Sequence, residues 1–268
     1  MEVTGIAQKR AAMPSGTNKV LDRRTLEKDN KSIIPFLKPG MTVLDVGCGS
    51  GFITKGIAER VGPEGKVIGM DPGKELIAHA RENHKSFDNL SFIGQDIFEY
   101  RGDEKFDLVT CSRTLQWLSS PLDAIFKMKS LLKPGAVLSI LDYNHEKILW
   151  SPAPTEAMKF FYGQFMAWRE DAGMNNRIAD DLAGMLSIAG LKRIVISDES
   201  ELSLSDDESF RETAGIWIKV AESRGKQMIG DGYINEIERL TAIEDYFNWI
   251  NTGNSMKMYL LGVSGYNE

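Results

Sequence analysis

The chain has 268 residues, of which 42% are hydrophobic and 26% are charged, and its formal net charge is -6. This length suits one large α/β domain or a domain with a cap, and the apolar fraction is sufficient for a sizeable core. The acidic balance disfavours a nucleic-acid partner, because phosphate binding needs clustered Lys and Arg side chains. No apolar run approaches the roughly 18 residues of a membrane span, and the basic N-terminal stretch lacks the apolar segment of a secretory signal. We therefore expect a cytoplasmic protein.

The cysteine and histidine content argues against a metal centre. The chain has two cysteines, Cys48 and Cys111, three histidines and no Cys-x-x-Cys pair. Zinc sites usually need clustered Cys and His ligands, and disulfides are rare in proteins that are not exported. We therefore expect neither a bound metal nor a disulfide.

A glycine loop between a strand and a helix is the most informative feature. Residues 41–46 are apolar and β-branched, and residues 52–60 have the spacing of a helix. Glycine at positions 47, 49 and 51 permits positive φ and lets a ligand approach the backbone without meeting a Cβ atom. The pattern predicts the first unit of a doubly wound sheet with a ligand at the loop. A tight turn in another α/β protein is the alternative.

The spacing of the glycines distinguishes between possible ligands. In the dinucleotide fingerprint G-x-G-x-x-G the third glycine would fall at Phe52. Instead an acid, Asp45, precedes G-x-G-x-G, and here the chain resembles the class I S-adenosylmethionine (SAM)-dependent methyltransferases, whose first motif is hydrophobic-hydrophobic-Asp/Glu-x-G-x-G-x-G. The resemblance implies that Asp45 favours the ammonium group of SAM and that the loop faces its methionine part. The loop residues expected at the cofactor are Gly47, Cys48, Gly49 and Gly51.

Two further acids follow predicted strands. The run 66–70 ends at Asp71, about twenty residues past the glycine loop, where a ribose diol would bind. The resemblance gives Asp71, followed by Pro72, that role, although Asp71 could also cap the helix predicted at 74–85. After the strand at 90–94, the resemblance places Asp96 near the adenine amine and Ile97 on the ring. An Asp at a strand end is otherwise an ordinary turn former.

The loop after the fourth predicted strand, 106–111, should border the transferable methyl group, because ligands lie at the carboxyl ends of parallel strands. It begins with Ser112 and Arg113, and Arg113 could pair with a substrate carboxylate or simply face solvent. Its phrase Leu115-Gln116-Trp117-Leu118 resembles small-molecule methyltransferases, including the trans-aconitate, malonyl-carrier-protein and, more loosely, ubiquinone/menaquinone enzymes. We expect Ser112 at the cofactor, and Arg113 and Gln116 at the substrate.

The second half predicts additions to this plan. A fifth strand at 136–141, a helix at 178–189 and strands at 193–197 and 256–263 would complete the sheet. The aromatic helix predicted at 155–172 should lie over the pocket mouth, with Trp168 as a substrate contact. For the aromatic residues of the insertion at 205–252, packing between helices is favoured over direct substrate contact. We expect the chain to divide into four segments. Residues 1–38 form a helical stretch that closes over the cofactor, with a helix at 19–37, and residues 39–142 form the SAM-binding core. Residues 143–177 form a cap insertion, and residues 178–268 form the rest of the sheet with a helical insertion at 205–252.

The segment after the fifth strand carries the candidate catalytic residues. His145 could act as general base, and Tyr143 could direct the nucleophile or face the sulfonium through its ring. The alternative is a polar, solvated loop.

The fold expected is therefore α/β: a Rossmann-like, doubly wound, mostly parallel seven-stranded sheet, with the last strand antiparallel and helical cap insertions. The function expected is transfer of a methyl group from SAM to an O, N or C nucleophile of a small molecule, releasing S-adenosylhomocysteine. The alternatives are an RNA or protein methyltransferase and a non-catalytic SAM-fold binding protein, and the oligomeric state stays open.

Overall fold

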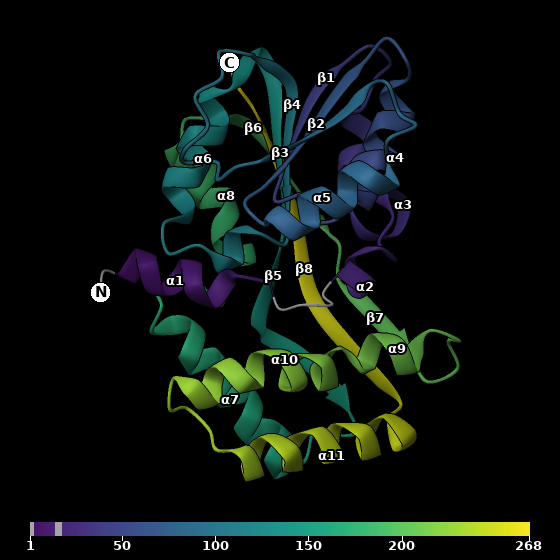
Figure 1. The fold of residues 1–268 in the computed structure, drawn as a ribbon, viewed down its shortest axis with the longest axis vertical. Coiled ribbons are helices and arrows are strands. Elements are labelled where there is room, and N and C mark those ends of the chain that lie inside the picture. Colours follow the sequence, from purple (N-terminus) through teal and green to yellow (C-terminus); the bar gives the residue numbers. More distant parts are fainter. Residues whose placement is uncertain (1–2, 14–17) are drawn as a thin grey trace.

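The computed structural model describes residues 3–13 and 18–268 and has one mixed β-sheet at its centre (Figure 1). The strand order is β3-β2-β1-β4-β5-β8-β6, and β7 pairs with one end of β8. The first five strands run parallel, whereas β8 is antiparallel to β5, β6 and β7. The strands are β1 (Thr42–Val46), β2 (Lys66–Asp71), β3 (Leu90–Gly94), β4 (Phe106–Ser112), β5 (Leu132–Ser151), β6 (Lys192–Asp198), β7 (Glu201–Leu204) and β8 (Ser255–Tyr266).

Helices cover both faces of the sheet. Strand β1 lies between β2 and β4, with Leu44 opposite Ile68 on one side and Val109 on the other, and all three side chains are buried. A strand buried on both faces needs a nearly continuous apolar sequence, which residues 42–46 supply. In Figure 1 the helices lie to either side of the strands. They are α3 (Leu26–Asp29), α4 (Phe52–Val61) and α5 (Lys74–Asn83) on one side, and α6 (Pro121–Ser130) and α8 (Ile178–Ile188) on the other.

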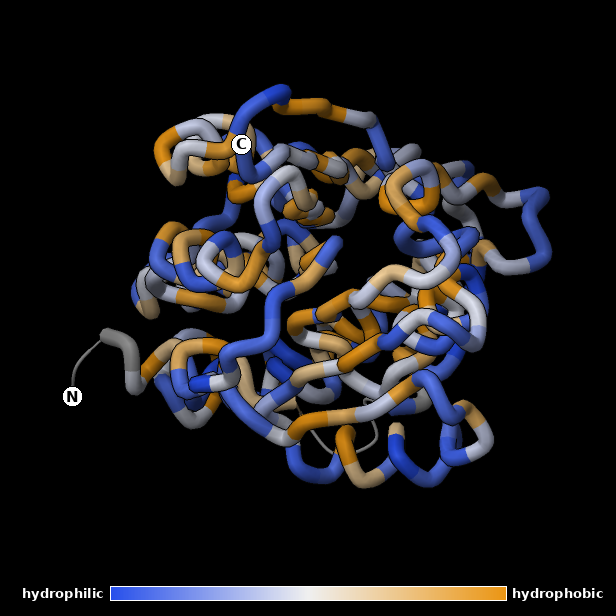
Figure 2. Tube along the Cα trace, turned by 90° about the horizontal axis from the view of Figure 1, so that it is seen from above, coloured by the Kyte–Doolittle hydropathy of each residue, from blue (hydrophilic) through white to orange (hydrophobic). Residues whose placement is uncertain are grey.

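A second apolar core lies under a helical cap. The cap consists of α7 (Glu156–Glu170), α9 (Phe210–Ala214), α10 (Ile216–Gly230) and α11 (Glu236–Thr252), which lie at the end of the molecule opposite the C-terminus (Figure 1). Its core is rich in aromatic rings, with the Tyr162 and Trp217 ring centroids 4.7 Å apart. In the view down the long axis, hydrophobic stretches run through the middle of the molecule and several outer loops are hydrophilic (Figure 2). No helix in the described ranges is both long and apolar enough to span a membrane.

The predicted doubly wound sheet with an antiparallel last strand is confirmed, with one strand more than expected because β7 pairs with β8. The alternative of a solvated loop at 142–146 is wrong, since β5 continues through these residues to Ser151 and pairs with β8 on both sides of an irregularity between Asn144 and Leu149. Buried Asp142 is satisfied inside the protein, because it accepts hydrogen bonds from the backbone N–H groups of Gln116, at 3.0 Å, and Tyr143, at 2.9 Å.

The single helix expected at 19–37 is also wrong. The structure has α2 (Asn18–Leu21), α3 and a 3-10 helix, η1 (Lys31–Phe36), after the separate helix α1 (Val3–Ala11). Thr25 starts a new helix by accepting a hydrogen bond from the Lys28 N–H, and Asn30 leaves helical geometry with φ -153°. Part of the expected 1–38 segment lies outside the described residues, and the predicted division into four segments stays a prediction.

The cap offers a test of its packing at two neighbouring positions. Phe161 is fully buried, whereas Phe160 is 43% exposed. We expect Phe161→Ala to lower the free energy of unfolding by about 3–5 kcal/mol, because it removes a buried ring and leaves a cavity. Phe160→Ala should change it by less than about 0.5 kcal/mol. Urea denaturation followed by circular dichroism measures both, and equal losses would contradict this packing.

Candidate functional site

A cavity of about 1290 Å³ opens at the carboxyl ends of β1 to β4. This volume exceeds the roughly 300–1,000 Å³ of a typical small-molecule site, so it has room for a cofactor together with a second molecule. The end residues of all four strands contribute to its wall. The lining residues fall in the stretches 45–53, 70–79, 94–99 and 111–128, and in the N-terminal stretch 7–24.

At three positions of the glycine loop a side chain would be strained and would clash with a neighbouring residue. Gly47, Gly49 and Gly51 have φ of +77°, +56° and +82°, in the left-handed region that side chains rarely adopt. A Cβ atom on Gly47 would overlap the Thr114 side chain. One on Gly49 would lie 2.9 Å from the Leu21 side chain of the N-terminal stretch, and one on Gly51 would lie 2.6 Å from the Phe92 ring. The loop is therefore packed on three sides.

Asp71 joins this loop to the end of β2. Its Oδ2 accepts a hydrogen bond from the Gly49 N–H at 3.1 Å, and its Oδ1 accepts one from the Gly73 N–H at 2.7 Å. Burial raises the pKa of Asp71 above its usual range, although both backbone hydrogen bonds favour the ionised form. The carboxylate keeps free lone pairs on both oxygens for a ligand.

Asp45 is a second buried acid in the cavity wall. The Thr54 hydroxyl donates to its Oδ2 at 2.7 Å. Burial raises the pKa of Asp45 to about 6, opposed by the Thr54 hydrogen bond and assisted by the nearby charge of Asp71. Two acids that are costly to ionise without a counter-charge thus lie at the ends of neighbouring strands.

The structure brings nearly all the expected cofactor residues together. Of the ten residues expected at the cofactor, nine line the cavity. Gly51 does not, because the Phe92 ring packs against it. Asp96 begins the turn at 97–99, where its Oδ1 accepts a hydrogen bond from the Phe98 N–H at 2.9 Å. The expected residues that line the cavity are Asp45, Gly47, Cys48, Gly49, Asp71, Pro72, Asp96, Ile97 and Ser112.

Arg113 lines the cavity but is already committed to protein partners. Its Nη2 pairs with Glu201 Oε1 at 2.5 Å, and its Nε donates to the Tyr143 hydroxyl at 2.9 Å. Its Nη1 donates to the Asp29 carbonyl at 2.6 Å. Burial disfavours the charge of Arg113, but Tyr143 and Glu201 outweigh burial and raise its pKa. Glu201 belongs to β7, the unexpected strand, so no feature of the sequence indicated this pairing.

The two candidate catalytic residues lie behind the cavity wall rather than in it. Neither Tyr143 nor His145 lines the cavity. His145 is buried, and its Nε2 lies 2.6 Å from Gln116 Oε1, which is consistent with a neutral ring that donates to Gln116. Burial and, secondarily, Arg169 lower the pKa of His145 well below its usual range. The geometry gives both residues a supporting position beneath the loop that follows β4.

The other expected substrate contacts have similar placements. Gln116 is buried, does not line the cavity, and donates from its amide to the Arg113 carbonyl at 3.3 Å. Trp168 is fully buried in the cap, where its indole N–H donates to Asp231 Oδ2 at 2.8 Å. Trp168 therefore packs within the cap and does not line the cavity.

The sequence did not indicate which N-terminal residues line the cavity, and the structure supplies them. Ala7, Leu21 and Arg24 are among those that do. In Figure 1 helix α1 lies between α6 and α8 on one side and the cap on the other.

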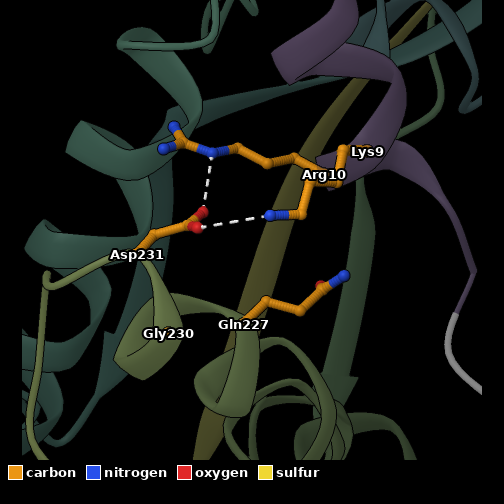
Figure 3. Close-up of a pocket in the computed structure, with 5 residues that line it drawn as sticks. All are labelled: Lys9, Arg10, Gln227, Gly230 and Asp231. Atoms are coloured by element: carbon orange, nitrogen blue, oxygen red, sulfur yellow. Dashed lines mark hydrogen bonds and ion pairs between the residues drawn. The ribbon is translucent and has the colours of Figure 1, made fainter.

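Ion pairs hold α1 against the cap, as Figure 3 shows. Arg10 Nε lies 3.1 Å from Asp231 Oδ2, and Lys9 Nζ lies 4.0 Å from Asp231 Oδ1. Arg10 also donates to the Trp168 carbonyl. Arg224 of α10 donates to the carbonyls of Arg10 and Ala12 at 2.7 and 2.6 Å, which satisfies the C-terminal end of α1. The N-terminal stretch is thus fastened across one side of the cavity.

The strand order, the acid and glycines of the loop and the acids at the ends of β2 and β3 together define a class I SAM-dependent methyltransferase fold. A family profile described as a methyltransferase domain matches residues 37–187, more than half of the chain. The chain therefore belongs to the methyltransferase domain family.

The similar proteins agree with this membership. An uncharacterized methyltransferase of Schizosaccharomyces pombe is 32% identical over 151 residues, which are 48% of this chain and 54% of that protein. The demethylmenaquinone methyltransferase of Staphylococcus carnosus is 26% identical over 172 residues, covering 60% of this chain and 71% of that enzyme. The chain spans from about two fifths to about seven tenths of the length of the curated relatives it matches.

A solved structure extends the likeness of fold to nearly the whole chain. A SAM-dependent methyltransferase from Aquifex aeolicus has a TM-score of 0.55 at 21% identity, with 96% of this chain and 99% of that chain covered. At this identity the comparison concerns the fold alone.

The raised pKa of Asp45 predicts a pH-dependent stability. Because folding raises this pKa from about 3.8 to about 6, the ionised form destabilises the folded state. The free energy of unfolding therefore falls as pH rises through and above these two values. The free energy of unfolding of Asp45→Asn should therefore be close to that of the ligand-free wild type at pH 4 and about 3 kcal/mol higher at pH 7. Denaturant unfolding across this range measures the difference.

Asp107→Asn serves as the control, because its effect on stability at pH 7 should have the opposite sign. Burial is the largest single influence on Asp107 and opposes its ionisation, but the hydrogen bonds from Lys133 and the Thr42 N–H, with the charge of Lys133, together outweigh burial and lower its pKa. Its ionised form stabilises the folded state at neutral pH, so this variant should be less stable than wild type at pH 7, with the gap closing as pH falls. A pH-independent effect of Asp45→Asn would contradict the assignment of its pKa.

Proposed function

We propose that the protein transfers a methyl group from SAM to a nucleophilic atom of a small molecule. The observation that carries this proposal is the convergence of Asp45, the glycine loop, Asp71 and Asp96 on one cavity at the carboxyl ends of the strands. Membership of the methyltransferase domain family supports the same cofactor.

In this proposal each acid serves one part of SAM. Asp71 accepts the ribose hydroxyls while it holds the Gly49 and Gly73 N–H groups. Asp96 lies near the adenine amine, with Ile97 against the ring, and ionised Asp45 favours the ammonium group. The glycine loop brings its backbone close to the methionine part.

The acceptor would occupy the side of the cavity bounded by Ser112, Arg113 and Trp117. Residues of the N-terminal stretch also line the cavity, and α1 is fastened to Asp231 at the end of α10, which favours a small molecule over a folded macromolecule. The net charge of -6 also disfavours RNA. Relatives named as acting on demethylmenaquinone or on malonyl-carrier protein fit a small acceptor group. A cytoplasmic location stays a prediction.

In this proposal the cavity residues act mainly by positioning the cofactor and the acceptor. Methyl transfer is an in-line displacement in which the acceptor atom attacks the methyl carbon and the bond to the sulfonium sulfur breaks. Holding both molecules in line supplies much of the rate enhancement, and enclosure excludes water. A protonated acceptor loses its proton during or before the transfer.

Binding of S-adenosylhomocysteine to a variant of Asp71 tests the cofactor assignment. We expect Asp71→Asn to weaken binding by roughly 10- to 100-fold, because a charged acceptor of two hydroxyls is lost. Asp123→Asn is the matched control, since Asp123 also lines the cavity but lies in the first turn of α6, away from the glycine loop. Isothermal titration calorimetry measures all three proteins. Equal affinities for the wild type and Asp71→Asn would contradict the assignment.

The acceptor class has its own test. The protein is incubated with methyl-labelled SAM and either a low-molecular-mass extract or the RNA and protein fractions. We expect label in the small molecules. Label confined to RNA or protein would contradict the small-molecule proposal, and tight cofactor binding without any transfer would favour a binding protein.

A further inference from the structure

One edge of the sheet is open and apolar. Strands β6 and β7 pair with the same side of β8 in one register, so that residues 195–204 run antiparallel to 255–264. No strand of the described ranges pairs with the outer side of β6. Val195 and Ile196 at this edge are 49% and 55% exposed. Edge strands are usually protected from pairing with another chain by charged side chains or proline, and residues 194–197 contain neither.

The backbone groups at this edge alternate in direction. The Glu199 N–H donates to the Leu260 carbonyl of β8 at 3.1 Å. In an antiparallel ladder, successive residues direct their N–H and C=O groups to opposite sides of the strand. The groups of Ile196 and Asp198 in β6 therefore face away from β8, as do those of the even-numbered residues of β7.

Side chains occupy part of this edge along β7. The Ser200 N–H donates to Asp198 Oδ1, and the Leu204 N–H donates to Asp207 Oδ2, each at 2.9 Å. At the other end, an irregularity in the pairing of β6 lies before Val195. The open stretch is therefore the part of β6 around Ile196.

The charges that flank this stretch suit a second copy of the same strand. Lys192 and Arg193 precede the apolar residues, and Asp198 and Glu199 follow them. If two copies pair antiparallel about Ile196, the basic start of each strand lies beside the acidic end of the other. Opposite charges on facing strands stabilise such pairing.

The ion pairs within the chain leave one charge of each sign for this contact. Arg193 pairs with Glu268 at 2.6 Å, and Glu199 pairs with Lys31 at 3.6 Å. Lys192 and Asp198 are exposed and form no ion pair with any described residue.

The same charges disfavour a contact centred further along the edge. Pairing about Ser200 would bring Asp198, Glu199 and Glu201 of both copies together. Like charges on facing strands are destabilising. The charge pattern therefore selects the pairing centred on Ile196.

We propose that the protein forms a symmetric dimer in which two copies of β6 pair antiparallel about Ile196. The Ile196 residues would face each other at the two-fold axis and exchange backbone hydrogen bonds. The sheets of the two subunits would then be continuous. Ile188, which is 66% exposed at the end of α8, would extend the apolar contact because α8 packs on β6.

Sedimentation velocity over a range of protein concentrations tests the dimer. We expect the wild-type mass to approach twice the monomer mass as concentration rises to about 100 micromolar. Ile196→Pro should weaken the dimer by roughly 10- to 100-fold, because both copies lose the N–H that faces the other. Proline is tolerated at a sheet edge where the N–H faces solvent, so the monomer should stay folded. Ile196→Lys, which places two like charges at the axis, should also weaken the dimer.

A control and a charge exchange test the position of the contact. Leu202→Lys should leave the dimer unchanged, since Leu202 is 56% exposed on the same edge but lies outside the proposed pairing. Lys192→Glu should weaken the dimer, and Lys192→Glu combined with Asp198→Lys should restore part of its affinity, because the opposite charges face each other again. Circular dichroism checks that every variant is folded.

The contradicting results are equally specific. A wild type that stays monomeric throughout, or a dimer as stable in both Ile196 variants as in the wild type, would overturn the inference. Equal weakening by Leu202→Lys would contradict the pairing about Ile196. None of these results bears on methyl transfer, since no residue of 188–204 lines the cavity.

Discussion

The site depends on one carboxylate that ties the glycine loop to the neighbouring strand. Asp71 at the end of β2 accepts hydrogen bonds from Gly49 in the loop after β1 and from Gly73 before α5. The loop is further fixed by the Gly47 and Cys48 N–H groups, which donate to the Met70 carbonyl at 2.7 and 3.1 Å. Because the acid is also in the cavity wall, the group that shapes the loop is available to a ligand there.

The acceptor side is built differently, through long-range connections. Strands β5 and β8 extend past the parallel sheet and carry the cap, and β7 adds Glu201 next to Arg113. Arg113 has φ of +55°, an uncommon conformation for a side-chain-bearing residue, and its hydrogen bonds to Tyr143, Asp29, Ser112 and Glu201 hold it there. Changes in the cap can therefore reach the loop after β4 through packed and hydrogen-bonded groups.

Local patterns made the cofactor half predictable from sequence. The apolar run before Asp45, the spaced glycines and the acids at strand ends act within a few residues of one another, and the parallel sheet then brings them together. The acceptor half depends on partners far apart in the chain. Residues 142–146 are mostly polar and have the sequence of a loop, but residues 142–144 pair with β8 and Asp142 accepts a hydrogen bond from the Gln116 N–H, so the strand continues. Likewise, nothing near Arg24 or Glu201 in the sequence distinguishes them from surface charges.

The most direct test of the account is calorimetric titration of the wild-type protein with S-adenosylhomocysteine and, separately, with NAD. Phe52 stands where the dinucleotide fingerprint needs its third glycine, and the acids around the cavity suit a ligand with an ammonium group and no phosphate. We expect micromolar binding of S-adenosylhomocysteine and no binding of NAD. Binding of NAD alone would contradict it and would turn attention to hydride transfer.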